Sequence, residues 1–233
     1  MRLADLKKEL AAAADPERAR NLAWFFKTAK GEYGHGDRFI GLTVPTIRRI
    51  AHSYVHLPLT DVEKLLASPI HEYRFAGLEI LVAQYERDKS KATFDFYLKH
   101  TRFVNNWDLV DTSASYIVGE YLLTRPRKIL YRLAKSPNLW ERRIAIVSTF
   151  AFIRAGEIDD TFAIAKLLLE DDHDLIHKAV GWALREAGKQ STPALLRFLK
   201  ENYSALPRIT LRYAIERFPA PRRKRLLAGV LAD

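Results

Sequence analysis

Hydrophobic residues recur three and four positions apart through almost the whole chain. Pro, Ser, Thr, Asp and Asn interrupt them at intervals of about 15 residues. This spacing puts the apolar side chains on one face of successive α-helices, and Asp15-Pro16 and Thr192-Pro193 are typical helix starts. The alternation expected of a β-strand is absent. The pattern therefore predicts an all-α protein of about 14 helices.

From about residue 60 the predicted helices form pairs. The second helix of each pair begins near residue 70, 106, 138, 174 or 206, so the period alternates between 36 and 32 residues. A period in this range is typical of a HEAT-like α-solenoid. We expect a single repeat domain over 1–233, with N-terminal helices and a Gly-rich loop in 1–58 and about five helix pairs in 59–233. We further expect a right-handed superhelix, in which the second helices line a basic concave face.

The second helices align with one another, and the alignment separates small positions from polar ones. The small residues are Ala76, Ser113, Ala145 and Ala179. The polar residues, each two positions earlier, are Arg74, Asp111, Arg143 and His177. Small side chains allow helices to approach closely, and we expect the polar side chains to project along a common inner face.

The segment 30–43, KGEYGHGDRFIGLT, is the one clear glycine-rich loop. It follows no predicted strand and lacks a GK[ST] ending, which argues against a phosphate-binding loop of the NTPase kind. We interpret it as a mobile connector between the N-terminal helices and the repeats.

The charge of the chain is strongly basic. The net charge is +10, and residues 174–233 hold twelve Lys/Arg and five Asp/Glu, which is +7 of that total. This charge favours a polyanionic partner, but it does not distinguish nucleic acid from an acidic protein or a membrane surface. The chain has no cysteine, no apolar stretch near the roughly 20 residues of a membrane span and no signal-peptide pattern. We therefore expect a cytoplasmic protein without disulfides.

Two tryptophans stand four residues from a charged residue on predicted inner helices. Trp107 precedes Asp111, and Trp182 follows Lys178. A carboxylate on a basic face repels phosphate, so a cationic substrate or transition state would have to offset that repulsion. Two alternatives stay open at this point: an ion pair between Asp111 and Arg143, and tryptophans that belong to the core.

Other polar groups have plainer interpretations. The histidine pairs 52/56 and 173/177 are spaced for a metal, but neither has an HExxH motif or a third ligand, so we expect no metal site. Asp108 could cap the helix or support Asp111. The basic run 222–225 is a solvated helix end that could reach a phosphate.

Three motifs resemble the AlkD-type bacterial DNA alkylation repair glycosylases, in the same order. They are WDLVD (107–111), LWERRIAIV (139–147) and HKAVGWALRE (177–186), and FFK (25–27), GEYGHGDRFIGL and HEYRFAGLEIL extend the similarity over most of the chain. The resemblance implies a monofunctional enzyme without a cofactor. Such an enzyme hydrolyses the N-glycosidic bond of N3- and N7-alkylated purines in duplex DNA and leaves an abasic site. It would act as a monomer at the nucleoid.

Carried over to this sequence, the resemblance makes Asp111 the catalytic aspartate and Trp107 and Trp182 the active-site tryptophans. Phe25 stands where the family has a tyrosine, so the role of that hydroxyl is lost or passes to Tyr33. The residues expected to bind DNA are Arg143, Lys178, Arg185, Arg208 and Arg212. The alternative is a HEAT-like protein without catalytic activity that binds DNA or serves as a protein scaffold.

Overall fold

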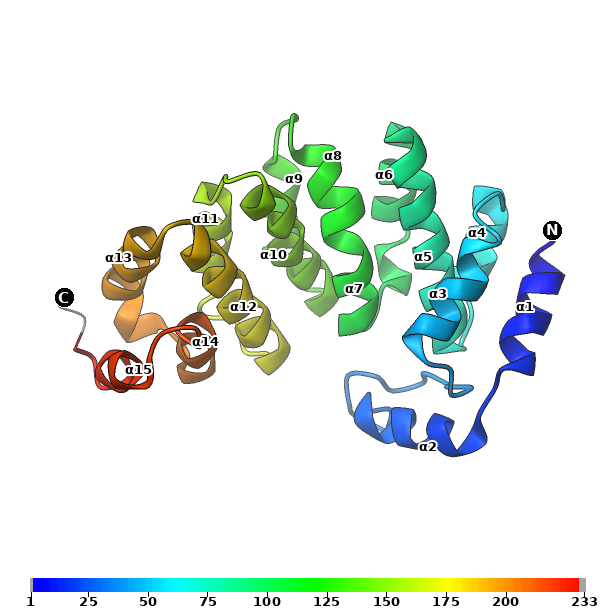
Figure 1. Ribbon diagram of the computed structural model, residues 1–233, viewed down its shortest axis with the longest axis horizontal. Coiled ribbons are helices and arrows are strands. Elements are labelled where there is room, and N and C mark those ends of the chain that lie inside the picture. The colour runs from blue at the N-terminus through cyan, green and yellow to red at the C-terminus, as the bar shows by residue number, and fades with distance from the viewer. Residues whose placement is uncertain (1, 231–233) are drawn as a thin grey trace. The chain divides into compact units, whose positions relative to one another are not determined.

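The computed structural model describes residues 2–230, and this part of the chain is helical without any strand (Figure 1). The all-α fold class predicted from the sequence is confirmed. The chain divides into two compact units, Met1–Ile117 and Val118–Asp233, which are described in turn. The single repeat domain over 1–233 stays a prediction, as do the right-handed superhelix and its basic concave face.

Unit 1 consists of helices joined by short connections and by the Gly-rich loop. Its helices are α1 (Leu3–Ala12), α2 (Pro16–Phe25), α3 (Val44–His52), α4 (Leu59–Leu66), α5 (His71–Asp88), α6 (Lys91–Lys99), the 3-10 turn Thr101–Phe103 and α7 (Trp107–Ala114). Asp15 caps α2 by accepting hydrogen bonds from two backbone N–H groups of its first turn, as its position before Pro16 predicts. A π-helical turn, Ser115–Gly119, follows α7 directly.

Unit 2 continues the same pattern of paired helices. Its helices are α8 (Glu120–Leu122), α9 (Lys128–Leu133), α10 (Leu139–Arg154), α11 (Asp159–Leu167), α12 (Asp174–Gln190), α13 (Thr192–Asn202), the 3-10 turn Tyr203–Ala205, α14 (Arg208–Ala214) and α15 (Ala220–Leu227). The second helices of the predicted pairs are α5, α7, α10, α12 and α14. Each begins within two residues of its predicted start, so the helical repeat is confirmed.

Close helix packing depends on the small residues of the alignment. Ala76, Ser113, Ala145 and Ala179 are all buried, as predicted. Gly181 shows how close the helices come in unit 2, because a Cβ atom added there would lie 2.5 Å from Cβ of Tyr213 on α14. Any side chain larger than hydrogen at Gly181 would force α12 and α14 apart.

Two of the four aligned polar residues, Arg74 and Arg143, do not project along an open face, which corrects the sequence-based expectation for them, whereas Asp111 and His177 are half-buried. Arg74 and Arg143 are buried, with 3% and 5% of their surface exposed. Arg74 donates to the carbonyl oxygen of Ser68 at 2.8 Å, and Arg143 donates to that of Leu175 at 2.6 Å. A buried backbone carbonyl needs a donor, and these guanidinium groups supply one at the connections between helices. Arg74 therefore holds the connection between α4 and α5, and Arg143 links α10 to the first turn of α12.

The second half of the Gly-rich loop is anchored to α5, which corrects its interpretation as a mobile connector. The buried carboxylate of Glu72 accepts hydrogen bonds from the backbone N–H groups of Ile40, Gly41 and Leu42 at 3.1, 2.7 and 3.3 Å. Gly41 has φ +88°, and a Cβ atom there would lie 2.0 Å from the carbonyl oxygen of Asp15. Only glycine fits this conformation and this close approach.

Candidate active site

The candidate active site in unit 1 is built on the first turns of α7. The helix starts at Trp107 because the buried side chain of Asn106 accepts a hydrogen bond from the backbone N–H of Trp107 at 2.8 Å. Trp107 and Asp111 are one helical turn apart on α7, and both are half-buried. The two residues thus share one face of the same helix.

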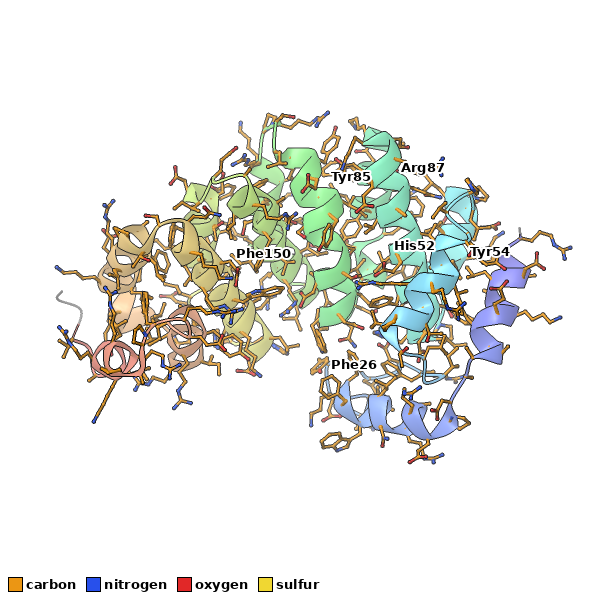
Figure 2. The ribbon with its side chains drawn as sticks, in the orientation of Figure 1. Phe26, His52, Tyr54, Tyr85, Arg87 and Phe150 are labelled. Atoms are coloured by element: carbon orange, nitrogen blue, oxygen red, sulfur yellow. The ribbon has the colours of Figure 1, made fainter. Side chains whose placement is uncertain are left out.

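Aromatic rings fix the orientation of Trp107. The Phe26 ring lies nearly parallel to the indole, with centroids 5.2 Å apart and an interplanar angle of 13°. Figure 2 shows Phe26 between the end of α2 and the start of α7. Phe39 stacks on Phe26 at 5.1 Å, and Phe25 meets the indole edge-on at 6.1 Å. Phe26 covers one face of the indole, and Trp107 is only half-buried, so part of the indole is open to a ligand. We call these four residues the aromatic stack.

A buried ion cluster, formed by Asp37, His71, Arg74 and Asp108, lies beside the aromatic stack. The imidazole of His71 has Nδ1 3.2 Å from a carboxylate oxygen of Asp37 and Nε2 2.7 Å from one of Asp108. Arg74 binds the other oxygen of Asp37 at 2.7 Å. The amide of Asn106 also donates to Asp37 at 3.4 Å. The cluster thus joins the Gly-rich loop, α5 and the first turn of α7.

His71 is a cation in this cluster. Burial lowers its pKa, but the facing carboxylates of Asp108 and Asp37 outweigh that effect and raise the pKa to about 9. For Asp37, burial raises the pKa, but the hydrogen bond from His71 and the charge of Arg74 bring the net shift below its usual range. With two cations and two carboxylates the cluster has no net charge, so it imposes little repulsion on a cationic ligand nearby.

His71 connects the ion cluster to the aromatic stack. Its ring stacks on Phe39 with centroids 4.6 Å apart and also lies 5.1 Å from Phe26. The sequence analysis did not single out His71 or Asp37, and it left the role of Asp108 open. The structure makes Asp108 the ion-pair partner of His71. The available signals were the Asp in the Gly-rich loop and the polar first turns HEYR and NNWD.

The residues after Asp111 tie α7 to its neighbours. Thr112 donates to Glu79 of α5 at 2.8 Å, and Arg48 of α3 binds the same carboxylate at 2.9 Å. These three side chains line a cavity of about 260 Å³. The Thr112 contact therefore holds α7 against α5. Burial raises the pKa of the nearby Tyr97 hydroxyl, and the negative charge of Asp111 adds to that effect.

In unit 2, Trp182 lies on α12 and packs against Phe150 of α10, with ring centroids 4.3 Å apart. It is half-buried. Lys178, one turn earlier, forms an ion pair with Asp174 at 2.6 Å. Arg143, which was predicted to contact DNA, has 5% of its surface exposed, and its guanidinium donates to the carbonyl oxygen of Leu175 on α12. Its contact with DNA stays a prediction.

The other predicted DNA-binding residues of unit 2 differ in their partners. Arg185 pairs with Glu186 at 3.1 Å and also with Glu216. Arg208 is exposed and donates to the carbonyl oxygen of Leu227. Arg212 is exposed, and no ion pair or hydrogen bond of its side chain occurs within residues 2–230. Near the end of the chain, a cavity of about 440 Å³ is lined by the basic residues Arg208, Arg223 and Lys224 together with apolar ones.

The histidine pair 173/177 is occupied by backbone hydrogen bonds. His173 accepts from the N–H of Leu175 at 3.1 Å and so caps α12, and His177 bonds to the carbonyl oxygen of Asp171. Over residues 2–230, no group of three or more His, Asp or Glu side chains is placed to hold a metal ion. Over the same residues, no helix is both long enough and apolar enough to span a membrane.

Residues 6–218 match the family model described as DNA alkylation repair enzyme, so the chain belongs to this family. A solved structure titled predicted DNA alkylation repair enzyme, from Enterococcus faecalis, is similar with a TM-score of 0.74. The sequences are 19% identical over 89% of this chain and 97% of that one. AlkD2 from Streptococcus mutans is similar with a TM-score of 0.54 and 19% identity, over 94% of this chain and 98% of that one. No curated protein matches the chain.

Proposed function

We propose that this protein is a monofunctional DNA glycosylase that excises cationic N3- and N7-alkylated purines from duplex DNA. The observation that carries the proposal is the half-buried carboxylate of Asp111, one turn after the ordered indole of Trp107, in a chain of the DNA alkylation repair enzyme family. The proposed enzyme is a monomer, needs no cofactor and acts at the nucleoid.

The chemistry needs one carboxylate rather than a strong general acid. An alkylated purine already carries a positive charge, so it leaves as a neutral base when the bond between its nitrogen and C1′ of the deoxyribose breaks. Positive charge then develops on the sugar, and the Asp111 carboxylate stabilises it. The oxygen of a water molecule bonds to C1′, and its proton passes to Asp111 or to solvent. The products are the free base and an abasic site.

Trp107 would contact the charge on the lesion. The face of an indole favours a cation by roughly 0.5–2 kcal/mol, which discriminates an alkylated nucleotide from a neutral one. The aromatic stack and the ion cluster hold the ring, so little conformational freedom is lost on binding. Phe25 lies edge-on beside Trp107 and adds an apolar wall where a hydroxyl would stand in the family. We assign Trp182 the same role toward the substrate.

The proposed partner is duplex DNA, bound through its phosphates. Arg212 has no intramolecular partner among the described residues, and Arg208 lines the basic cavity near the end of unit 2. Contacts with phosphates position a protein on DNA without reading its sequence. We therefore expect affinity that depends on salt and hardly on sequence.

Excision by the variant Asp111→Asn tests the proposal. The protein is incubated with a duplex that contains one 7-methylguanine, and alkali then cleaves the strand at any abasic site. We expect excision to fall by roughly 10² or more, because the amide keeps the shape but cannot stabilise the developing charge. Affinity for undamaged duplex should stay equal or rise slightly, since a repulsive charge is removed.

The matched control is Asp172→Asn, which changes an exposed aspartate in a connection of unit 2. It should excise at the normal rate. An unchanged rate for Asp111→Asn, or a large fall in its melting temperature, would make Asp111 a structural residue. Normal DNA affinity with no excision by the unmodified protein would favour a binding protein without catalytic activity.

A further inference from the structure

Helix α2 carries an exposed tryptophan, Trp24, that the candidate active site does not explain. None of the residues of α2 is buried, and in Figure 1 the helix runs across the ends of neighbouring helices of unit 1. Trp24 is 75% exposed and Phe25 is 55% exposed, more than any other large hydrophobic residue that the structure describes. The indole of tryptophan has a large apolar surface, and exposing that surface to water is unfavourable in free energy. An indole this exposed is therefore a candidate contact for a ligand.

Two cations that form no ion pair among the described residues lie near Trp24, although the charge of Arg20 also acts on Asp15. Arg20 lies one helical turn earlier on the same face of α2, and Nζ of Lys27 lies 5.4 Å from the centroid of the indole. Lys30 follows in the loop. All three side chains are exposed, and within residues 2–230 none forms an ion pair. Their positive charges are therefore available to an anionic ligand.

The segment is held rigidly beside the candidate active site. Phe26 is buried and stacks on Trp107, while Phe25 meets the edge of the same indole. Lys27 has φ +58°, a left-handed conformation that is uncommon for a residue other than glycine and that ends α2 abruptly. One buried ring thus fixes the end of the helix, and Trp24 lies outside on the exposed side of its last turn.

We propose that Trp24, Arg20 and Lys27 form a second DNA contact, distinct from the cleavage site at Trp107 and Asp111. The indole of Trp24 stacks on a nucleobase that is unpaired or displaced at the lesion, and the two cations bind the flanking phosphates. A strand of DNA alternates flat bases with anionic phosphates. The indole of Trp24 fits the base, and the cations on either side of it fit the phosphates. An acidic protein or a lipid surface would use the cations but would give the exposed indole no planar partner. The inference rests on the DNA binding of the proposed function.

The test measures stacking without any base excision. The probe is a duplex in which 2-aminopurine faces a tetrahydrofuran abasic-site analogue, so no glycosidic bond at that site can be cleaved. We expect the protein to quench 2-aminopurine fluorescence and to bind this probe more tightly than the fully paired duplex. Stacking of one base contributes about 1–3 kcal/mol, so Trp24→Ala should weaken probe binding about 5- to 150-fold and abolish the quenching.

Three comparisons make the result specific. Trp24→Phe should retain most of the quenching, because the aromatic face remains. Leu167→Ala, at another exposed hydrophobic residue, should leave it unchanged. Affinity of Trp24→Ala for the paired duplex should change less than twofold. A loss of equal size on both duplexes, or no loss on either, would overturn the inference. So would dimerisation, or binding to anionic vesicles, that Trp24→Ala abolishes.

The outcome separates this inference from the proposed function. If 7-methylguanine is excised normally and Trp24→Ala still quenches the probe, the second contact is wrong and the glycosylase proposal stands. If no base is excised but quenching depends on Trp24, the contact stands and the catalytic role of Asp111 fails. The variant's melting temperature, which should match that of the unmodified protein because Trp24 is exposed, shows that the fold is intact.

Discussion

Trp107 and Trp182 stand in similar sequence settings but in different structural ones. Each is four residues from a charged side chain on the second helix of a pair. Trp107 is held by aromatic rings from α2 and from the Gly-rich loop, and a buried ion cluster lies beside them. Trp182 packs against Phe150, a neighbour within the ordinary helix packing of unit 2. The comparison shows that Trp107 is oriented by rings from outside its own helix, whereas Trp182 contacts a ring of the preceding second helix.

Cations within each unit differ in whether an acidic neighbour neutralises them. Residues 174–233 contribute most of the excess positive charge of the chain. Lys178 and Arg185 in that segment form ion pairs with acidic neighbours. In unit 1, Arg48 and Arg74 form ion pairs, whereas Arg20 and Lys27 have none among the described residues. Whether a cation is available to phosphate therefore depends on its neighbours and not on the count of charges alone. The following predictions test these differences, from the largest expected effect to the smallest.

The largest effect should come from His71→Ala. The substitution removes the cation that Asp37 and Asp108 share; Asp37 keeps Arg74, but the half-buried Asp108 loses its ion-pair partner, and breaking a buried pair typically costs about 3–5 kcal/mol. We expect urea unfolding to show a loss of that size. The control is His35→Ala, at an exposed position of the Gly-rich loop, which should change stability by less than about 0.5 kcal/mol. Equal stabilities for the two variants would show that the ion cluster does not support α7.

The charge of His71 also predicts how stability depends on pH. Its pKa is about 9 in the folded protein and near 6.5 in an unfolded chain, so protonation stabilises the fold. The contribution is complete below about pH 6.5 and is lost as the pH rises to about 9, on the order of 3 kcal/mol in total. Unfolding titrations at pH 6 to 9.5 should show this decline. The decline should be absent in His71→Gln, and its persistence there would assign it to other groups.

Next in size is the difference between the two tryptophans. Trp107→Ala should lower excision of 7-methylguanine by roughly 30-fold, which corresponds to the upper end of a cation–π contact. Trp182→Ala should also reduce excision more than affinity for undamaged duplex. Truncating a core tryptophan costs about 3–5 kcal/mol of stability, so melting is measured beside activity. If Trp182→Ala loses stability and both DNA functions equally, Trp182 belongs to the core and the two regions are unlike in function as well.

The smallest effect concerns individual phosphate contacts. Arg212→Ala should weaken binding to undamaged duplex several-fold and reduce the slope of log K against log[salt] by about 1. Arg185→Ala should have a smaller effect, because Glu186 and Glu216 already neutralise Arg185. A flat salt dependence of the unmodified protein would contradict phosphate binding altogether. A larger effect for Arg185 than for Arg212 would show that the ion pairs open when DNA binds.

Local sequence patterns specify the elements of this fold and the helix that carries the candidate site. Apolar spacing and helix-start residues are local, so they predicted the second helices to within two residues, and the small residues at Ala76 and Ala145 marked the close packing. The motif WDLVD placed Trp107 and Asp111 on one turn of helix without any tertiary information. Family membership followed from such motifs because they are contiguous in the chain.

Which polar residues pair and which are buried depends on how the helices pack in three dimensions. His71 lies 34 residues from Asp37 and 37 residues from Asp108, and no local pattern specifies a contact at that separation. The motif around Arg143 does not specify its surroundings, and folding buries this residue and brings its guanidinium to the backbone of α12. The energy of a charged side chain depends on its surroundings, because burial penalises a charge and a partner compensates it. These surroundings come from segments far apart in sequence, and they exist only after the helices have packed.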